Sequence, residues 1–228
     1  MTGITNKNVV DFYINTHKDD KSDKVYPNLM LVRSYGFLSE KGNKNILDYG
    51  CGYGANALFL LQKGAHVTIA DTSIYAIQKT TKKFNDNGFK KDSFTEKLIE
   101  KDSKKLPFDD NSFDIITCLS VLSLLSNQTT IESLLAEFRR VLKPEGRIFI
   151  DINGQDSEFA VYSNKVSDNI FEYKGRNKNL APILAFCPVN EKKFQQIVEQ
   201  FFNILEIGRT EHSLFGFKEQ EFIAICEK

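Results

Sequence analysis

The chain has 228 residues, of which 41% are hydrophobic and 26% are charged, a balance typical of a globular domain rather than a disordered segment. Thirty basic residues balance thirty acidic ones, so no net charge draws the protein to nucleic acid or to an anionic membrane. The four cysteines are scattered without metal-ligand spacing, and no metal site is expected. A secretory signal pattern and an apolar run of roughly 20 residues are both missing, which predicts a cytoplasmic protein without membrane insertion.

The elements predicted in chain order describe one domain over residues 1–228. Residues 1–41 are expected to form a helical lid segment with a polar interruption. Residues 44–152 form a core with strands over 46–49, 67–70, 98–99, 113–119 and 147–152, separated by segments of mostly helical periodicity. This alternation indicates a parallel sheet with right-handed crossovers. Residues 153–189 are expected to be an irregular insertion on the substrate side, and 190–228 a helix followed by two strands.

The most informative stretch is residues 46–54, Ile-Leu-Asp-Tyr-Gly-Cys-Gly-Tyr-Gly, where a strand runs into a glycine loop and then a helix. Glycines let the backbone approach a ligand closely, and the following helix offers free N–H groups. The pattern therefore favours a nucleotide-type site, although a tight strand-to-helix turn explains it as well.

Two acidic residues near this loop narrow the choice of ligand. Asp48 lies two residues before the first glycine, where its charge repels a pyrophosphate, which argues against NAD or ATP. Asp71 lies 17 residues beyond Gly54 at the end of the next strand, where an acid can bind both hydroxyls of a ribose. The alternative for Asp71 is a helix-capping acid, but Ser73 already supplies a cap. An adenosine that carries an amino acid in place of phosphates matches both residues, and S-adenosylmethionine is such a molecule.

Residues 46–54 resemble the first motif of the class I, Rossmann-like S-adenosylmethionine-dependent methyltransferases, of the small bacterial type. Residues 71–73 (Asp-Thr-Ser), 101–103 (Lys-Asp-Ser) with the segment that follows to Asp114, and 138–146 (Phe-Arg-Arg-Val-Leu-Lys-Pro-Glu-Gly) resemble later motifs of that family in the same order. The resemblance implies an α/β fold, a three-layer sandwich around a seven-stranded, mostly parallel sheet whose last strand is antiparallel.

The resemblance also implies which residues bind S-adenosylmethionine and its product S-adenosylhomocysteine. Gly50, Gly52 and the loop backbone would hold the methionine part, Asp71 the ribose, and Asp102 and Ser103 the adenine. The sulfonium would be flanked by the residues that end the fourth strand, Leu119, Ser120 and Val121. Further cofactor contacts are expected from Asp48, Cys51, Asn56, Thr72 and Ser73. For Asp102 the alternative is an ordinary surface acid.

The N-terminal segment supplies three more candidate cofactor residues, Tyr13, Tyr26 and Arg33, placed over the methionine end. Arg33 can bind a carboxylate with paired N–H donors, and Pro27 suits the first turn of a helix. The alternative is a helix packed by its apolar face with Arg33 in solvent.

The acceptor is expected to be a small molecule or a glycan that is methylated at oxygen. Relatives often carry a histidine after the fourth strand, but residues 121–125 read Val-Leu-Ser-Leu-Leu, so no base follows from the resemblance. His17, His212 and Tyr26 are the weak candidates for this role, and a solvated surface histidine is the alternative for each histidine. His66 precedes the second strand, at the edge opposite the ligand crevice. The basic residues of 172–178 are either a site for a phosphate or acidic sugar or a solvated loop.

Two other functions remain open at this point. A methyltransferase-like protein can bind the cofactor without turnover and act as a partner or regulatory subunit. A related enzyme can transfer the aminopropyl group of the decarboxylated cofactor.

Overall fold

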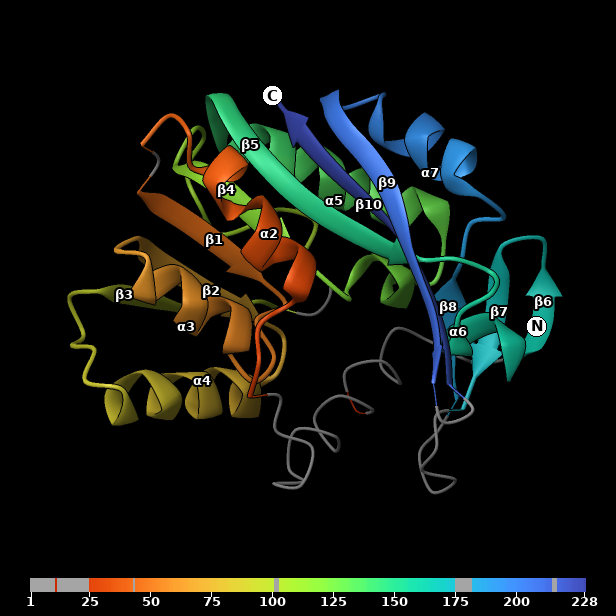
Figure 1. Ribbon diagram of the computed structural model, residues 1–228, viewed down its shortest axis with the longest axis horizontal. Coiled ribbons are helices and arrows are strands. Elements are labelled where there is room, and N and C mark those ends of the chain that lie inside the picture. Colours follow the sequence, from red (N-terminus) through yellow and green to blue (C-terminus); the bar gives the residue numbers. More distant parts are fainter. Residues whose placement is uncertain (1–10, 12–24, 43, 101–102, 175–181, 215–216) are drawn as a thin grey trace.

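The computed structural model describes residues 11, 25–42, 44–100, 103–174, 182–214 and 217–228 (Figure 1). Its centre is a seven-stranded sheet in the order β3-β2-β1-β4-β5-β10-β9. β10 is antiparallel to both of its neighbours, and the other neighbouring strands are parallel, which confirms the predicted fold class. The strands are β1 Asn45–Tyr49, β2 His66–Asp71, β3 Phe94–Leu98, β4 Phe113–Cys118, β5 Leu142–Asn153, β9 Asn203–Leu214 and β10 Phe217–Glu227.

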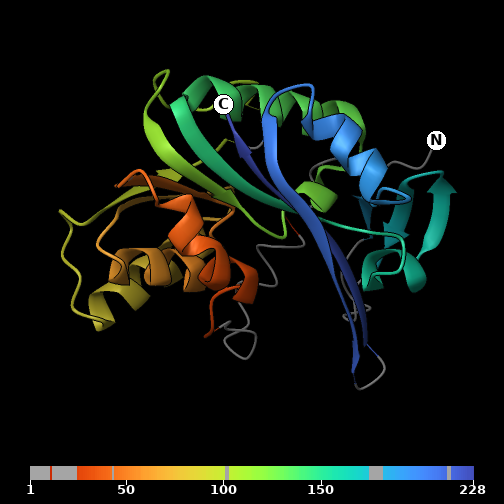
Figure 2. The same ribbon diagram turned by 45° about the horizontal axis from the view of Figure 1, so that its top comes forward.

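Helices cover both faces of this sheet. α2 (Leu29–Leu38), α3 (Ala55–Gln62) and α4 (Ile74–Asp86) lie on one face, and α5 (Gln128–Val141) and α7 (Glu191–Val198) lie on the other (Figure 2). Successive strand residues point to opposite faces, so the sheet contributes to two separate cores. Ile46, Ile115 and Phe149 pack with α2, α3 and α4, whereas Leu47, Ile116 and Ile150 pack with α5 and α7. Among the described residues, no helix is long and apolar enough to cross a membrane.

The predicted position of the third strand is wrong by several residues. The structure places β3 at Phe94–Leu98, and Ile99 lies just beyond its end. β3 is an edge strand in which Phe94 alone is fully buried. Because an edge strand buries few side chains, the polar residues of this segment conceal it in the sequence.

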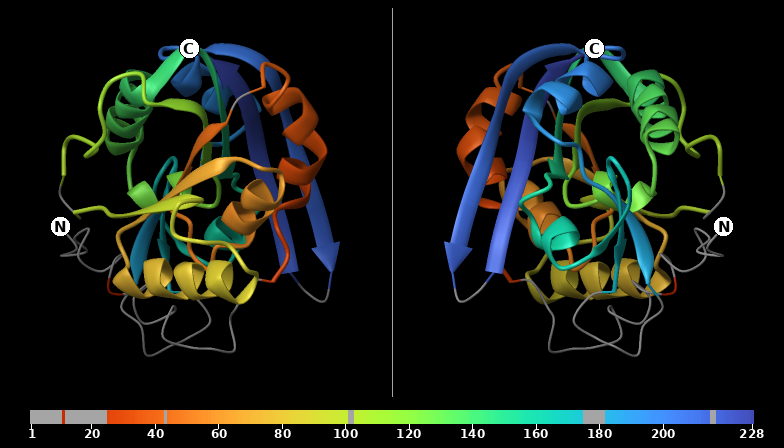
Figure 3. Two further views of the ribbon diagram at one scale, coloured as in Figure 1. Left: turned by 90° about the vertical axis from the view of Figure 1, so that its left-hand side faces the viewer. Right: turned by 90° about the vertical axis from the view of Figure 1, so that its right-hand side faces the viewer.

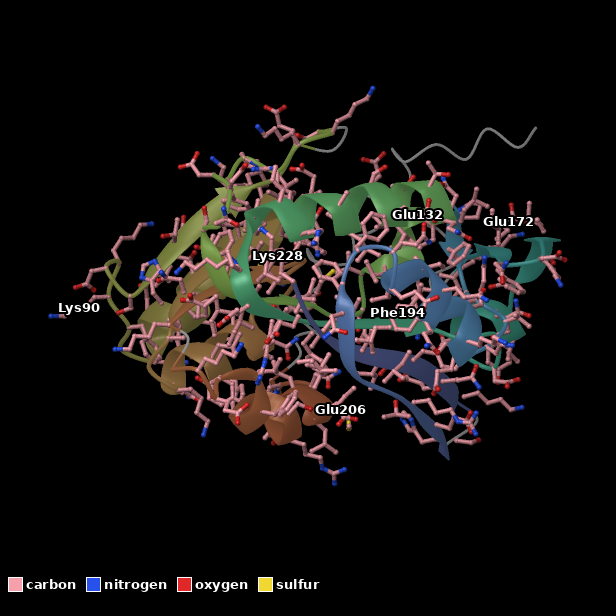
Figure 4. All side chains as sticks on the ribbon, turned by 90° about the horizontal axis from the view of Figure 1, so that it is seen from above. Lys90, Glu132, Glu172, Phe194, Glu206 and Lys228 are labelled. Atoms are coloured by element: carbon pink, nitrogen blue, oxygen red, sulfur yellow. The ribbon has the colours of Figure 1, made fainter. Side chains whose placement is uncertain are left out.

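The prediction of an irregular segment over 153–189 is also wrong. After the short helix α6 (Glu158–Val161), the chain forms a three-stranded antiparallel sheet of β6 (Asn164–Ser167), β7 (Ile170–Tyr173) and β8 (Ile183–Phe186). Its small core contains Ala160, Phe171, Ala185 and Cys187. Glu172 of this sheet lies toward the same end of the molecule as Glu132 of α5, and Lys90 lies at the other end (Figure 4). Each strand has four residues, which is too short for a clear period in the sequence.

The residues between β3 and β4 are held against α5 by one arginine. Arg140 makes five hydrogen bonds, as many as a guanidinium has N–H groups: two to Glu137, one to Asp110, and one each to the carbonyls of Leu106 and Phe108. Glu137 also accepts the amide of Leu106 at 2.7 Å. Residues 103–112, which the structure describes, form no helix or strand, and these hydrogen bonds hold part of that segment in place.

Replacing Arg140 by Met should lower the free energy of unfolding by about 3 kcal/mol, because Glu137 and two carbonyls lose a charged donor. Arg139→Met is the matched control, since the neighbouring arginine makes one exposed hydrogen bond, to the carbonyl of Phe201. It should cost less than about 1 kcal/mol. Urea denaturation of both variants measures the difference, and equal losses would contradict the proposed role of Arg140.

Candidate active site

A cavity of about 650 Å³ opens where the parallel strands end. A ligand crevice at the carboxyl ends of the strands is the rule for sheets of this type, and the volume is ordinary for a small-molecule site. The lining runs from Asp71, at the end of β2, to Glu219 and Glu221 of β10. Four strand spacings separate β2 from β10, which corresponds to roughly 19 Å. The cavity therefore extends across the ends of several strands.

The glycine loop after β1 forms the floor of this cavity, and residues 49–56 all line it. Gly50 has a φ of +72°, and a Cβ on it would lie 2.3 Å from a methyl carbon of Val121. Gly54 has a φ of +74°, and a Cβ there would meet Thr80 of α4 at 2.5 Å. Thr80 also donates a hydrogen bond to the carbonyl of Gly52 at 3.0 Å. The loop is thus packed between α4 and the turn that follows β4, with no space for side chains at these two glycines.

Asp71 supports the loop as well as lining the cavity. Its carboxylate accepts the amide of Gly52 at 3.0 Å and the amide of Ser73 at 2.8 Å. Ser73 is fully buried and caps α4, as predicted, by accepting the amide of Ala76. Thr72, between them, lines the cavity. The acid predicted to bind ribose is therefore held by two backbone amides at the cavity edge.

Asp48 is a buried carboxylate beneath the loop, with 2% of its surface exposed. Thr117 donates a hydrogen bond to its Oδ1 at 2.7 Å, and its Oδ2 has no hydrogen-bond partner among the described residues. Burial raises the pKa of Asp48 to about 7, the Thr117 hydrogen bond opposes this, and the charge of Asp71 adds to it. A desolvated carboxylate favours a positive group nearby. Asp48 does not itself line the cavity, so its expected contact with the cofactor stays a prediction.

Leu119, Ser120 and Val121 come together in the cavity wall, where β4 ends. Ser120 has a φ of +59°, a conformation that residues other than glycine rarely adopt. Its amide donates a hydrogen bond to the buried carboxylate of Asp151 in β5, at 2.6 Å. Sequence patterns did not point to Asp151. In the sequence, Asp151 is noticeable only as a charged residue inside the apolar run of 148–152.

The N-terminal segment reaches the cavity through residues 26–28. The amide of Asn28 donates to Oδ1 of Asn56 at 2.8 Å, which joins the start of α2 to the start of α3. Asn28 is the N-cap of α2, so Pro27 lies before the helix and not in its first turn as predicted. Tyr26 lines the cavity but is 85% exposed. Arg33 is exposed on α2 and lies outside the cavity lining.

Other predicted residues lie in and around the site. Ser103 lines the cavity, and its hydroxyl donates to the carbonyl of Lys105. Cys51 lines the cavity but is largely buried, and burial raises its pKa well above the usual value, which makes it a poor nucleophile.

His212 is exposed and lies outside the lining, opposite Glu219 in the β9–β10 pair. His66 pairs with Thr95 at the opposite edge of the sheet, as expected. Tyr13, His17 and Asp102 lie outside the described residues.

The structure also adds lining residues that sequence patterns did not reveal. Glu219 and Glu221 come from β10, whose hairpin with β9 extends past the end of β5 (Figure 3). Thr130, Ser133 and Leu134 come from α5. The hydrophobic periodicity of the sequence predicted this helix and these strands. Their position at the cavity depends on the order of strands in the sheet. In the part of the chain that is described, no three His, Cys, Asp or Glu side chains form a metal-binding group.

The raised pKa of Asp48 makes stability depend on pH. A carboxyl with a folded-state pKa above its unfolded value keeps a proton that the unfolded chain has lost, so stability falls as the pH rises from about 4 to about 7. The change from 3.8 to about 7 corresponds to roughly 4 kcal/mol. Asp48→Asn should remove most of this fall and be more stable than the wild type at pH 8. Urea denaturation at pH 5 and pH 8 tests this, and an equal loss in both proteins would refute it.

Comparison with known proteins finds a family match over part of the chain. Residues 47–150 match the family described as a methyltransferase domain. The chain is 26% identical over 184 residues to a ubiquinone biosynthesis O-methyltransferase of Rickettsia conorii, with 78% of this chain and 61% of that protein covered.

Two solved structures share the fold. An S-adenosylmethionine-dependent methyltransferase of Methanosarcina mazei aligns with a TM-score of 0.69 and 22% identity, covering 82% of this chain and 92% of that one. An N-methyltransferase of Bradyrhizobium japonicum in complex with S-adenosylhomocysteine aligns with a TM-score of 0.65 and 15% identity, covering 97% and 98%. The matched domain contains the glycine loop, Asp71 and Ser120, which lie where the parallel strands β1, β2 and β4 end. The chain therefore contains a segment, residues 47–150, that matches the methyltransferase-domain family, on a fold that it shares with solved S-adenosylmethionine-dependent methyltransferases.

Proposed function

We propose that this protein transfers the methyl group of S-adenosylmethionine to a hydroxyl oxygen of a small molecule or glycan. The observation that carries the proposal is the continuous cavity, which begins at the glycine loop and Asp71 and ends at Glu219 and Glu221. The first end has the features of a cofactor site. The second end lies beside it and supplies polar groups for an acceptor.

The cofactor end fits S-adenosylmethionine by the chemistry of its residues. Asp71 would accept hydrogen bonds from the ribose, Ser103 would meet the adenine, and Gly50 and Gly52 would lie against the methionine part. The partnerless Oδ2 of buried Asp48 supports a ligand that carries positive charge. When bound, the cofactor supplies a methyl group on a positively charged sulfur. The chain's own residues hold and orient it.

The acceptor end favours a ligand with hydroxyl groups. Carboxylates accept hydrogen bonds from hydroxyls and repel anionic groups, so Glu219 and Glu221 fit a neutral or cationic acceptor better than a phosphorylated one. The similarity to an O-methyltransferase of ubiquinone biosynthesis also supports oxygen as the accepting atom.

Catalysis would depend mainly on alignment of the two ligands. Holding an acceptor in line with the methyl group can supply on the order of 7–11 kcal/mol. A general base adds typically 10²–10⁴-fold for a hydroxyl acceptor. Glu219 and Glu221 line the cavity and His212 does not, so we assign the base to one of these carboxylates.

The alternative is a protein that binds the cofactor without turnover. It is favoured by the position of two candidate bases from the sequence, because His212 lies outside the lining and Tyr26 is mostly exposed. Binding and turnover experiments separate the two functions.

The cofactor assignment predicts that Asp71→Ala weakens binding of S-adenosylhomocysteine by about 1.5–3 kcal/mol, the value of hydrogen bonds to a charged group. Titration calorimetry measures this loss. Asp86→Ala is the control, because Asp86 pairs with Lys82 on the exposed face of α4. The 2′-deoxy analogue tests the contact directly. Removing the hydroxyl should cost less affinity in Asp71→Ala than in the wild type, and equal costs would exclude the ribose assignment.

Turnover is tested by release of S-adenosylhomocysteine with a panel of phenols, sugars, amines and phosphorylated sugars. We expect release with neutral hydroxyl acceptors, and a fall of about 100-fold or more in kcat in either Glu219→Gln or Glu221→Gln. Glu206 is exposed on β9, and Glu206→Gln is the control that should leave kcat unchanged. Cofactor binding without release across the whole panel would favour the alternative.

A further inference from the structure

The turn that follows β4 is fastened to the end of β5 by two hydrogen bonds. The amide of Ser120 donates to Oδ1 of Asp151 at 2.6 Å, and the amide of Asn153 donates to the hydroxyl of Ser123 at 2.9 Å. Asp151 and Asn153 are both buried. The two strands are already paired as far as Cys118 and Ile150, so these contacts continue the connection beyond the regular ladder. The end of β5 therefore determines where this turn lies.

Ser120 needs such a contact because its backbone is left-handed. Four described residues other than glycine have a positive φ: Asn111, Ser120, Ser126 and Glu145. Among these four, Ser120 alone lines the cavity. A left-handed serine places its Cβ close to the following carbonyl, so the conformation must be held by its surroundings. The short hydrogen bond to a carboxylate is a contact of the strong kind.

The burial of the Asp151 carboxylate, which makes this contact, lowers the stability of the fold. It is 2% exposed, and it lies opposite Ile223 of β10 on the face of the sheet that also buries Phe149. A carboxylate in apolar surroundings is unfavourable unless it is hydrogen-bonded. An apolar residue would suit this position better for stability alone. The carboxylate is therefore explained by what it holds rather than by its packing.

The same turn shapes the cofactor end of the cavity. Val121 follows Ser120, and its methyl carbon occupies the space that a Cβ on Gly50 would need. A change in the backbone of Ser120 would therefore alter the position of Val121 beside the glycine loop. Asp151 thus acts on the loop through Ser120 and Val121 in sequence, although it is not itself part of the cavity lining.

We propose that Asp151 is a positioning residue that keeps Ser120 in the left-handed conformation and thereby builds the wall of the S-adenosylmethionine site. The inference rests on the proposed function, because it assigns the cavity wall to cofactor binding. A glycine at position 120 adopts a positive φ without strain, and it should therefore make the carboxylate dispensable.

The test is a rescue experiment read by calorimetric binding of S-adenosylhomocysteine. Asp151→Ala should weaken binding by about 10-fold or more. Adding Ser120→Gly should restore most of that affinity. Adding Ser126→Gly is the matched control: Ser126 has nearly the same φ, +62°, but lies outside the cavity lining, and this change should restore nothing. Asp151→Asn keeps an acceptor oxygen and should lose less than Asp151→Ala, which provides a second variant if the alanine protein does not fold.

Amide hydrogen exchange at Ser120 gives a readout that needs no cofactor. The amide should be protected in the wild type and exchange at least about 10-fold faster in Asp151→Ala. Unchanged affinity in Asp151→Ala, or equal rescue by the two glycine variants, would overturn the positioning role. A wild-type protein with a protected Ser120 amide but no affinity for S-adenosylhomocysteine would instead overturn the proposed function, and with it the assignment of the wall to that cofactor.

Discussion

The close packing of the glycine loop between Thr80 and Val121 is the constraint on which the rest of the site depends. Side chains at Gly50 and Gly54 would overlap these two residues, so the loop touches α4 on one side and the turn after β4 on the other. Three elements far apart in the sequence are thus joined at one place. The amides of Gly52 and Ser73 bind the same carboxylate, Asp71, which adds the end of β2 to this junction. The glycine loop, α4, the turn after β4 and the end of β2 thus support one another around the cavity.

Buried carboxylates are the second feature of this edge of the sheet. Asp48, Asp71 and Asp151 lie at or near the ends of β1, β2 and β5, and each is at most 8% exposed. Their contacts differ, because Asp71 binds the loop amides, Asp151 binds the amide of Ser120, and Asp48 keeps one oxygen without a partner among the described residues. Burial of charge costs stability unless hydrogen bonds compensate for it. The fold thus gives up stability at the edge where a charged ligand would bind.

Residues from outside the core of 44–152 also line the cavity. Residues 26–28 before α2 and two carboxylates of β10, Glu219 and Glu221, line the cavity together with Thr130 and Ser133 of α5, which belongs to the core. The small sheet of β6, β7 and β8 lies at the end of the molecule where α5 begins (Figure 4).

From the sequence alone, the glycine loop and the acids beside it were predicted. The glycine loop, Asp48, Asp71 and the strand before Ser120 were readable because each is a local pattern, set by the spacing of glycines and acids along one strand and its turn. The three short strands of 164–186, the hydrogen bond from Ser120 to Asp151 and the carboxylates of β10 were not readable. These depend on which strands are neighbours, and a strand order of β4-β5-β10 brings together residues that are 30 to about 100 positions apart. Tertiary structure decided these contacts, because such pairings depend on the packing of the whole sheet and leave no local period in the chain.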